Sequence, residues 1–234
     1  MGMTINSKRL PELENEIVGC RKCPRLVAWR EEVAQVKRRA YLDWDYWGKP
    51  VPGFGDADAQ VLVIGLAPGA HGANRTGRMF TGDGSGDFLY PALYRAGFAN
   101  QPESTHQGDG MQLTGMFISA VCRCVPPANK PKMDEIARCL PFLEDEIDQL
   151  QRVKVIVALG GIAFNHTINI YRKRTSEELR FKFKHLGVYP LGDGLPILVS
   201  SYHPSRQNTQ TGRLTDSMFA EVWTKVNHII AGEY

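Results

Sequence analysis

The sequence predicts one α/β domain in which a four-stranded parallel sheet lies between two layers of helices. Short apolar runs of strand length alternate along the chain with longer segments whose apolar residues recur at helical spacing. This alternation is typical of a parallel sheet with helices on both faces, a three-layer α/β/α architecture. The length of 234 residues is sufficient for one sizeable core, so we expect residues 1–234 to form a single domain. The four predicted strands are 61–66, 116–121, 153–159 and 196–200.

Six helices are predicted around these strands. The stretch from 132 to 151 illustrates the signal, because its apolar residues recur every three or four positions and so share one helix face. Thr215 is expected to cap the last helix by accepting a hydrogen bond from its first turn. The aromatic segment 41–47 holds two tryptophans and is predicted to be an ordered loop rather than a linker. The predicted helices cover 10–17, 26–40, 85–98, 132–151, a stretch from Gly161 to about 172, and a stretch from Thr215 to 230.

Charge and composition restrict the classes of function and compartment. Lys and Arg number 28 against 25 Asp and Glu, and this net charge of +3 is compatible with a nucleic-acid partner without being diagnostic. No apolar run approaches the roughly 20 residues that span a bilayer, and the N-terminal stretch lacks the apolar core of a signal peptide. We therefore expect no membrane association and a cytosolic location. Five cysteines in that reducing compartment suggest metal or redox chemistry rather than disulfides.

Two polar loops carry the residues best suited to chemistry. The first continues the strand at 61–66 into a glycine-rich stretch that ends at Gly86, and so long a loop inside a compact domain is usually a binding or catalytic loop. Its glycines let the backbone turn sharply and approach a ligand closely. The second loop, 201–214, follows the fourth predicted strand. Because ligands of such folds bind beyond the carboxyl ends of the strands, the loops after the first, second and fourth strands are expected to converge.

Four of the five cysteines can form one metal centre. Cys20 and Cys23 make a Cys-x-x-Cys pair, and the second pair must come from Cys122, Cys124 and Cys139. Four thiolates from these places can hold Zn²⁺ or a [4Fe–4S] cluster, and their spacing does not separate the two. Periodicity does not choose between Cys122 and Cys124 either, because residues two apart on a continuing strand point to the same face. Buried free thiols are the alternative without a metal.

Two motifs and the cysteine pattern together resemble the iron–sulfur uracil-DNA glycosylases, most closely those of family 5, also called B-type. The motifs are Gly65-Leu-Ala-Pro-Gly-Ala-His-Gly72 and Ser201-Tyr-His-Pro-Ser-Arg-Gln-Asn208. The likeness extends from Cys20 to Thr215. It implies a four-stranded parallel sheet with helices on both sides, in agreement with the alternation of strands and helices.

A [4Fe–4S] cluster is the cofactor that the resemblance implies. The family holds its cluster on Cys-x-x-Cys and two later cysteines, one in a Cys-x-Pro-Pro segment and one in the helix that follows. In this chain, Val125-Pro126-Pro127 follows Cys124. The implied role is structural, because the cluster would tie the N-terminal helices at about 8–40 to the core and the implied chemistry needs no electron. The match selects as ligands Cys20, Cys23, Cys124 and Cys139, and leaves Cys122 as a free thiol.

The resemblance implies a monofunctional DNA glycosylase that acts as a monomer on uracil-containing DNA and initiates base excision repair in the prokaryotic cytosol. Such an enzyme hydrolyses the bond between a base and its deoxyribose after the base has left the duplex and entered a pocket. Bond breakage makes the sugar cationic and the base anionic. The site therefore needs a stacking surface, donors aimed at the base, and negative charge or an activated water near the sugar.

Three side chains supply these groups by resemblance. Phe80 matches the aromatic ring that stacks on the flipped base, and His203 can donate a hydrogen bond to a base carbonyl. Asp83 is the expected catalytic carboxylate, which either positions water or stabilises the sugar cation. Capping of the helix that starts near Ser85 is the alternative role of Asp83. Asp87 is the weaker candidate, because it is expected to lie in the first turn of that helix.

Two alanines shape the expected specificity and keep other functions open. Ala67 stands where many relatives carry a catalytic Asp or Asn, and Ala120 aligns with an asparagine that reads uracil in another branch of the superfamily. A pocket that checks fewer base edges should accept further deaminated bases such as hypoxanthine. Ala67 also leaves open a DNA-binding or sensing module without catalysis. A covalent uracil-DNA binder, in which His71 traps the sugar, is a third possibility.

The remaining candidates surround the pocket. Arg206 or Gln207 can fill the space that the flipped base leaves in the duplex. Contacts to the base or substrate are expected from Gly65, Leu66, Ala67, Gly69, His71, Asn129 and Asn208. Contacts to DNA are expected from Arg75, Arg206 and Gln207. Neutralisation of phosphates is expected from Arg75, Arg78, Lys130 and Arg213.

Overall fold

The strands form one mixed sheet whose four central members are parallel. The computed structural model describes residues 9–233. Residues 1–8 and Tyr234 lie outside the described residues. The expected start of the N-terminal helical region at about residue 8, and the first part of the stretch expected to lack a signal-peptide core, fall among them. The strand order is β1-β3-β2-β4-β6-β5, with both edge strands antiparallel to their neighbours. The strands are β1 (Phe54–Gly55), β2 (Val61–Gly65), β3 (Met116–Ala120), β4 (Val155–Leu159), β5 (Gly187–Pro190) and β6 (Ile197–Ser201).

All four predicted strands are present, and the described sheet has two further strands at its edges. The bounds of β2, β3, β4 and β6 lie within two residues of the predicted ones. The edge strands escape sequence analysis for a physical reason. β1 has only two residues, and β5 contains Gly187 and Pro190, residue types that are depleted in strands.

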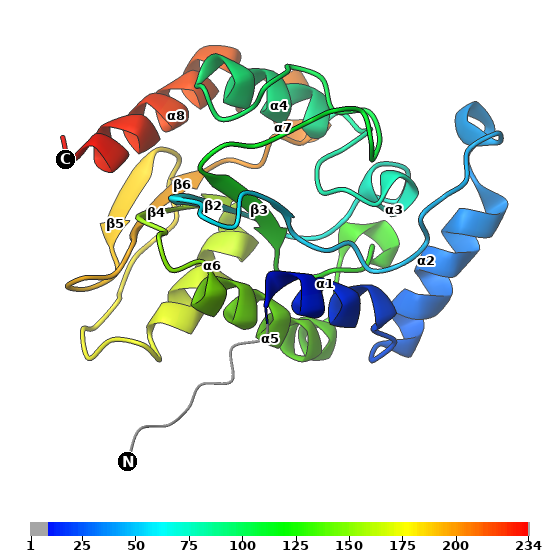
Figure 1. Cartoon of the computed structure of the whole chain (residues 1–234), viewed down its shortest axis with the longest axis horizontal. Coiled ribbons are helices and arrows are strands. Elements are labelled where there is room, and N and C mark those ends of the chain that lie inside the picture. The colour runs from blue at the N-terminus through cyan, green and yellow to red at the C-terminus, as the bar shows by residue number, and fades with distance from the viewer. Residues whose placement is uncertain (1–8, 234) are drawn as a thin grey trace.

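Helices cover both faces of the sheet, as Figure 1 shows. α4 (Gly86–Arg95) and α8 (Asp216–Ala231) pack on one face, and α5 (Met133–Gln149) and α6 (Gly161–Tyr171) pack on the other. α1 (Leu10–Gly19) lies against α5. Each corresponds to a predicted helix. None of the described helices is long and apolar enough to cross a membrane.

The remaining helices are short or end early. The helix predicted over 26–40 ends at Val36, because Lys37 adopts a left-handed φ of 55° that breaks the helix. Thr215 caps α8 as predicted, since its Oγ1 accepts a hydrogen bond from the backbone N–H of Met218 at 3.3 Å. Single turns inside loops have too few residues to show an apolar period. The elements concerned are α2 (Pro24–Val36), the 3₁₀ turns η1 (Arg39–Tyr41) and η2 (Pro127–Asn129), α3 (Ala73–Thr76) and α7 (Arg206–Gln210).

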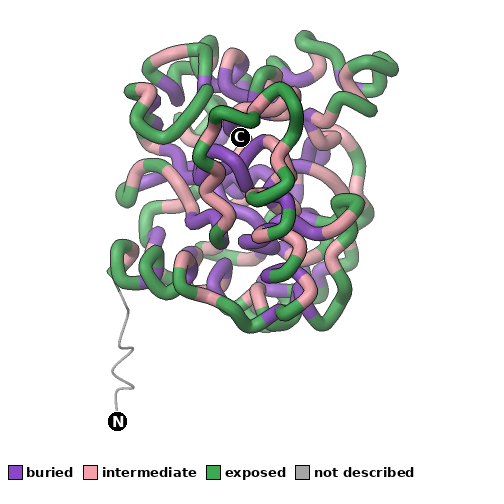
Figure 2. Tube along the Cα trace, turned by 90° about the vertical axis from the view of Figure 1, so that its right-hand side faces the viewer, coloured by how far each residue is buried: buried purple, intermediate pink, exposed green. Residues whose placement is uncertain are grey.

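Alternate residues of the central strands pack on opposite faces of the sheet. On β2, Val61 and Val63 pack with Trp223 of α8, whereas Leu62 and Ile64 belong to the cluster beneath α5 and α6. Figure 2 shows the result, with buried segments inside and exposed ones on outer helix faces and loops. The two clusters hold the sheet rigidly between its helix layers and so fix where each strand ends.

The carboxyl ends of the parallel strands meet at one edge of the sheet. Gly65 at the end of β2 pairs in register with Ala120 at the end of β3, and Leu159 of β4 pairs with Ser201 of β6. The backbone N–H of Val121 donates to the carbonyl of Gly65 at 3.0 Å, which continues this pairing beyond the strands. The loops after β2, β3 and β6 therefore leave the sheet side by side.

Candidate active site

The three loops that were expected to converge enclose one pocket of about 360 Å³. This volume lies within the usual range for small-molecule sites of ~300–1,000 Å³. The predicted site residues that line the pocket are Gly65, Leu66, Ala67, Gly69, Phe80, Asp83, Asn129, His203 and Gln207. Sequence analysis did not single out four other lining residues, namely Pro68, Met79, Ser85 and Ser205. Ala120, which was discussed only as a departure from relatives, lines it too.

The rings of Phe80 and His203 adjoin one another in the wall of this pocket. Their ring centroids are 5.8 Å apart and their planes are inclined by 32°. Phe80 has a left-handed φ of 53°, a conformation that costs a non-glycine residue free energy and persists only where the surroundings impose it. The ring lies over the end of β2, where a Cβ on Gly65 would come within 2.8 Å of Cζ of Phe80.

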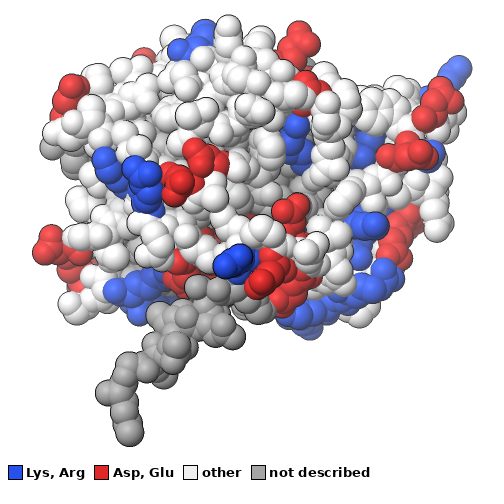
Figure 3. Space-filling model, in the orientation of Figure 1, with Lys and Arg blue, Asp and Glu red and all other residues white. Residues whose placement is uncertain are grey.

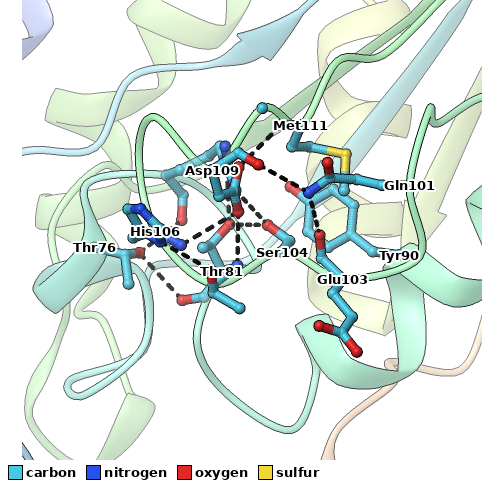
Figure 4. A network of polar contacts seen from close by, with 12 residues as sticks. Thr76, Thr81, Tyr90, Gln101, Glu103, Ser104, His106, Asp109 and Met111 are labelled. Atoms are coloured by element: carbon cyan, nitrogen blue, oxygen red, sulfur yellow. Dashed lines mark hydrogen bonds and ion pairs between the residues drawn. The ribbon is translucent and has the colours of Figure 1, made fainter.

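A buried polar network holds the backbone on both sides of Phe80. The hydroxyl of Tyr90 donates to the carbonyl of Met79 at 2.9 Å. On the other side, Oγ1 of Thr81 hydrogen-bonds Oγ of Ser104 at 2.7 Å, and both side chains lie in the network drawn in Figure 4. The network fixes the left-handed turn from two directions, so the Phe80 ring has little freedom.

Arg78 is the cation of this network, which corrects its prediction as a phosphate contact. Its side chain is buried, and it donates to Ser104 at 2.7 Å and pairs with Asp109 at 2.5 Å. Burial tends to raise the pKa of Asp109, but hydrogen bonds from Arg78 and from the backbone of Met111 and Thr105 outweigh it and hold the pKa well below its usual range. The guanidinium is therefore occupied inside the protein.

Asp83 lines the pocket and also holds the backbone at the start of α4. Its Oδ1 accepts hydrogen bonds from the backbone N–H groups of Ser85 at 2.9 Å and Gly86 at 3.2 Å, which caps the start of α4. Its Oδ2 lies in the space left by two glycines, because a Cβ on Gly69 or Gly72 would stand 2.7 or 2.0 Å from it. Burial raises the pKa of Asp83, and the two backbone hydrogen bonds oppose that rise. The weaker candidate, Asp87, is exposed in the first turn of α4 and does not line the pocket.

His203 is a neutral imidazole at physiological pH. Burial lowers its pKa to about 4, so the ring keeps one N–H donor and carries no charge. The residue follows β6, and its backbone carbonyl accepts a hydrogen bond from the side-chain amide of Asn208 at 2.8 Å. Asn208 was expected to bind substrate, but it does not line the pocket. It instead holds the loop that carries His203, because its short side chain turns back toward its own loop.

Two further predicted residues lie outside the pocket. Arg75 was expected to reach DNA, but its side chain is buried between the rings of Tyr41 and Trp44, at 4.0 and 3.9 Å from their centroids. Nδ1 of His71 hydrogen-bonds the hydroxyl of Tyr46 at 3.1 Å. Burial, followed by the nearby charges of Arg38 and Arg75, lowers the pKa of His71. His71 lines a neighbouring groove.

The remaining residues that were expected to contact DNA or phosphates differ in their position. Gln207 lines the pocket, whereas Arg206 lies against Gly84 in the neighbouring groove, where a Cβ on that glycine would come within 2.6 Å of the Arg206 Nε. Lys130 is exposed at the end of η2. The guanidinium of Arg213 lies over the ring of Tyr202 at 4.7 Å and is exposed to solvent.

Four cysteines from distant parts of the chain line a second, smaller cavity. They are Cys20, Cys23, Cys124 and Cys139, the set that the resemblance selected. Cys122 does not line this cavity. It is fully buried, its backbone N–H donates to the carbonyl of Leu66 in the pocket loop at 2.8 Å, and its thiol hydrogen-bonds the thiol of Cys139. Of the two cysteines that periodicity left equal, Cys124 lines the cavity and Cys122 contacts one of the cysteines that do.

Buried arginines surround the cysteine cavity. Arg30 of α2 donates from Nη1 to Sγ of Cys124 at 3.0 Å, and the backbone N–H of Arg123 donates to Sγ of Cys139 at 3.2 Å. Nε of both arginines and Nη1 of Arg123 are buried and have no hydrogen-bond partner in the described structure. The Arg123 side chain also pairs with the buried carboxylate of Glu146. Unpartnered N–H groups beside four thiols are suited to an anionic occupant of the cavity.

Comparisons with known proteins identify the family of this chain. The family model of the uracil DNA glycosylase superfamily matches residues 52–227. The chain is 52% identical over 206 residues to the type-5 uracil-DNA glycosylase of Thermus thermophilus, which covers 88% of this chain and 91% of that protein. It is 50% identical to the type-5 enzyme of Mycobacterium leprae, over 92% of this chain and 93% of the relative. It is 42% identical to that of Pyrobaculum aerophilum, over 89% and 88%. The chain therefore belongs to the uracil-DNA glycosylase superfamily, and within it to the type-5 uracil-DNA glycosylases.

Proposed function

We propose that the protein is a monofunctional DNA glycosylase that hydrolyses the N-glycosidic bond of uracil and of other deaminated bases in DNA. One observation carries this proposal: an aromatic ring and a carboxylate from the loop after β2 converge on one pocket with a neutral imidazole from the loop after β6. The type-5 relatives are named as uracil-DNA glycosylases, which supports uracil in DNA as the substrate. The reaction would begin base excision repair, and we expect the protein to act as a monomer in the prokaryotic cytosol.

The pocket suits a base that has been extruded from the helix. A duplex hides the glycosidic bond, so the target nucleotide must rotate out and place its base in the protein. Phe80 offers the flat face on which any base can stack, and the fixed backbone around it keeps that face in place. His203 lies beside Phe80, where its N–H can reach the edge of a stacked base. The arrangement holds the base from one face and one edge.

His203 is suited to the departing base. As the bond between C1′ and the base nitrogen breaks, its electron pair leaves with the base, whose carbonyl oxygens become more negative. A hydrogen-bond donor aimed at such an oxygen stabilises the transition state more than the ground state. With its pKa lowered to about 4, His203 donates without changing its own charge across the physiological pH range. Solvent supplies the proton that makes the released base neutral.

Asp83 is suited to the sugar. The deoxyribose becomes electron-poor at C1′, and the ionised carboxylate stabilises that charge and orients the water whose oxygen adds to C1′. The proton that this water loses goes to Asp83 or to solvent, which balances the hydrolysis. Because Oδ1 is held by two backbone N–H groups, Oδ2 is the oxygen available for this role.

The substrate range follows from the pocket wall. Ala67 and Ala120 both line the pocket, and their methyl groups offer no hydrogen bond to a base edge. A site that rejects a wrong base strongly does so by leaving its own buried polar groups unpaired. A wall without such groups discriminates weakly, so we propose that hypoxanthine is accepted beside uracil. A panel of duplexes that carry uracil, hypoxanthine or xanthine in defined pairs tests this range.

The activity itself is tested on duplex DNA with one uracil, followed by alkali, which cleaves the strand wherever a base has been lost. We expect cleavage by the wild-type protein and a loss of about 10²–10⁴-fold in the single-turnover rate for Asp83→Asn, the range typical of acid–base groups. Asp87→Asn is the matched control, because that carboxylate is exposed outside the pocket. An intact strand with the wild-type protein would favour a binding module. A denaturation-resistant adduct would favour a covalent trap, which the position of His71 outside the pocket does not support.

A [4Fe–4S] cluster is the proposed cofactor of the cysteine cavity. A single zinc ion needs donors that converge on one point at about 2.3 Å. Four thiolates can also hold a cluster, and the cluster is proposed here because the cysteine pattern resembles that of the iron–sulfur enzymes. Cys20, Cys23, Cys124 and Cys139 would hold it, and N–H groups donating to their sulfurs suit an anionic iron–sulfur centre. When bound, the cluster supplies a cross-link between the N-terminal helices and the core.

The cofactor has a direct test. Purified protein should be brown, with broad visible absorption and about four iron and four sulfide per chain, the content of a [4Fe–4S] cluster. Colourless protein with one tightly bound zinc would overturn the assignment. Retention of iron at 1 M salt without exogenous thiol distinguishes a built centre from adventitious metal.

A further inference from the structure

A groove of about 310 Å³ adjoins the base pocket. Gly69, Asp83, Ser85 and Asn129 line both hollows, so the two meet at the catalytic carboxylate. The groove then continues away from the pocket between two walls. One wall carries Arg206 beside the 82–85 turn, and the other carries Arg38 and Tyr41 from the N-terminal part of the chain.

The N-terminal wall is firmly attached to the catalytic loop. The backbone N–H of Trp47 donates to the carbonyl of Arg75 at 2.9 Å, and that of Gly48 donates to the carbonyl of Asn74 at 3.0 Å. The Arg75 guanidinium fills the space between Tyr41 and Trp44. In Figure 1 the turn beyond α2 accordingly stands beside α3. The aromatic segment 41–47, which the catalytic chemistry does not use, thus serves to place Arg38 beside the active site.

Arg75 connects this wall to both ends of the groove floor. Its Nε donates to the carbonyl of His71 at 2.8 Å, and its Nη2 donates to the carbonyl of Gly82 at 2.9 Å. Those two residues belong to the two loop segments that line the groove. The wall, the floor and the turn that carries Asp83 are therefore fixed relative to one another before any ligand arrives.

The groove has two exposed cations and, apart from Asp83, no acidic side chain in its lining. Neither Arg38 nor Arg206 is within ion-pair distance of a described carboxylate. The charge of Arg38 contributes to the lowered pKa of His71, which places that charge near the groove floor. Elsewhere, on the face drawn in Figure 3, Lys and Arg alternate with Asp and Glu rather than forming one cationic patch. Attraction of an anion here must come from these particular side chains.

We propose that this groove binds the sugar–phosphate backbone beside the flipped nucleotide, with a phosphodiester held between Arg38 and Arg206. The inference rests on the proposed function. A flipped nucleotide stays joined to phosphates on both sides, so a strand whose C1′ lies at Asp83 must leave the site through an adjoining hollow. A phosphate at this position would also repel Asp83, and the two arginines offset that repulsion. Arg38 is therefore a phosphate-binding residue supplied by the N-terminal segment.

The experiment compares Arg38→Gln with Arg39→Gln, its exposed neighbour that does not line the groove. Dissociation constants for a duplex with a non-cleavable uracil nucleotide are measured from 50 to 200 mM salt. A phosphate contact contributes about one unit to the slope of log K against log salt. We expect Arg38→Gln to lower that slope by about one and to weaken binding by about 3- to 10-fold, and Arg39→Gln to leave both near the wild-type values.

A neutral phosphate identifies the contact. Each duplex carries one methylphosphonate, a neutral phosphate analogue, at a different position beside the uracil. At one position the substitution should weaken binding to the wild-type protein but should not weaken binding to Arg38→Gln any further. This non-additivity is what a double-mutant cycle expects of two groups that interact. Equal slopes for the two glutamine variants, or additive losses at every phosphate, would overturn the proposal. Weaker inhibition of Arg38→Gln by free uracil would also overturn it, since a damaged base pocket would then explain the loss.

Failure of the groove proposal can be distinguished from failure of the proposed glycosylase activity. If wild-type protein binds the duplex but does not release uracil, the glycosylase proposal fails while the salt slopes still decide the groove. If uracil is released normally and the two glutamine variants behave alike, the groove proposal alone fails. Thermal unfolding of both variants provides the check on folding.

Discussion

The Phe80 ring and the His203 imidazole lie 5.8 Å apart and are inclined by 32°, although Phe80 follows β2 and His203 follows β6. At this centroid separation the two rings are in contact, so a flat face for stacking and a hydrogen-bond donor adjoin in the wall of the pocket. A planar base that lies on Phe80 would therefore have one edge beside His203. The contact between the two rings thus favours one orientation of the base.

The stacking role of Phe80 predicts a binding defect. Base–aromatic stacking contributes about 1–3 kcal/mol, so Phe80→Ala should weaken binding of uracil-containing single-stranded DNA by roughly 5- to 150-fold. Phe80→Tyr should retain most of the affinity, because it keeps the ring face. Fluorescence anisotropy with a single strand that carries a non-cleavable uracil nucleotide measures both, and equal affinity for the Ala and Tyr variants would contradict stacking.

The left-handed backbone of Phe80 predicts an inverted order of stability. At a φ of 53°, glycine is free of the strain that alanine would suffer. Phe80→Gly should therefore be more stable than Phe80→Ala by about 1 kcal/mol, although glycine ordinarily destabilises a fixed backbone. Urea unfolding of the two variants measures the difference. The opposite order would mean that the turn relaxes once the ring is gone.

Asp83 and His203 predict the shape of the pH–rate profile. The reaction needs ionised Asp83, and burial raises its pKa, so the rate should fall as pH drops through that raised value. His203, with its pKa lowered to about 4, should contribute no titration near 6.5. Single-turnover rates from pH 4 to 8 should fall on the acid side. His203→Gln should lower the rate at every pH without changing the apparent pKa of that fall. An acid limb unchanged in Asp83→Asn would assign it to another group.

The same pKa predicts that Asp83 costs stability. Its folded pKa lies above the unfolded one, so its contribution to stability is complete below the unfolded pKa and is lost as pH rises through the folded pKa. Asp83→Asn keeps an oxygen that can accept from Ser85 and Gly86, so it should raise the melting temperature at pH 7. The gain should shrink toward pH 4. Asp87→Asn, at an exposed position, provides the comparison.

The cysteine assignment predicts a contrast between neighbours. Cys124→Ser should lose the visible absorption and most of the iron, because it removes a ligand from the four that line one cavity. Cys122→Ser, two residues away, should keep both, since Cys122 lies outside that cavity. Iron content per chain measures the contrast. If Cys122→Ser lost its iron and Cys124→Ser kept it, Cys122 would be the ligand and Cys124 the free thiol.

The sequence predicts the framework well where one physical effect dominates. Apolar runs identify β2, β3, β4 and β6, because a strand buried on both faces leaves few alternatives. Thr215 identifies the start of α8 by its capping hydroxyl. The short edge strands β1 and β5 depend on pairing with a neighbour rather than on their own residues, so their sequences carry no comparable signal.

The site is less predictable where burial decides a role. Arg75 and Arg78 look like phosphate ligands in a glycine-rich loop, yet tertiary packing places one between two aromatic rings and pairs the other with Asp109. Asn208 has a side chain that could bind a substrate, but its amide donates a hydrogen bond to the His203 carbonyl. A sequence reports that a side chain can form a hydrogen bond, whereas the fold decides which partner lies within reach.

Gly72 and Gly86 set a limit on how this protein can vary. A Cβ on Gly86 would stand 1.7 Å from the carbonyl oxygen of Phe80, and one on Gly72 would stand 2.0 Å from Oδ2 of Asp83. Neither obstacle can move without displacing the stacking ring or the carboxylate. Both positions should therefore tolerate no other amino acid in a library of random substitutions selected for repair, although neither residue touches the reaction. A mutation that replaces either glycine with alanine, and so adds one methyl group, should be enough to abolish function.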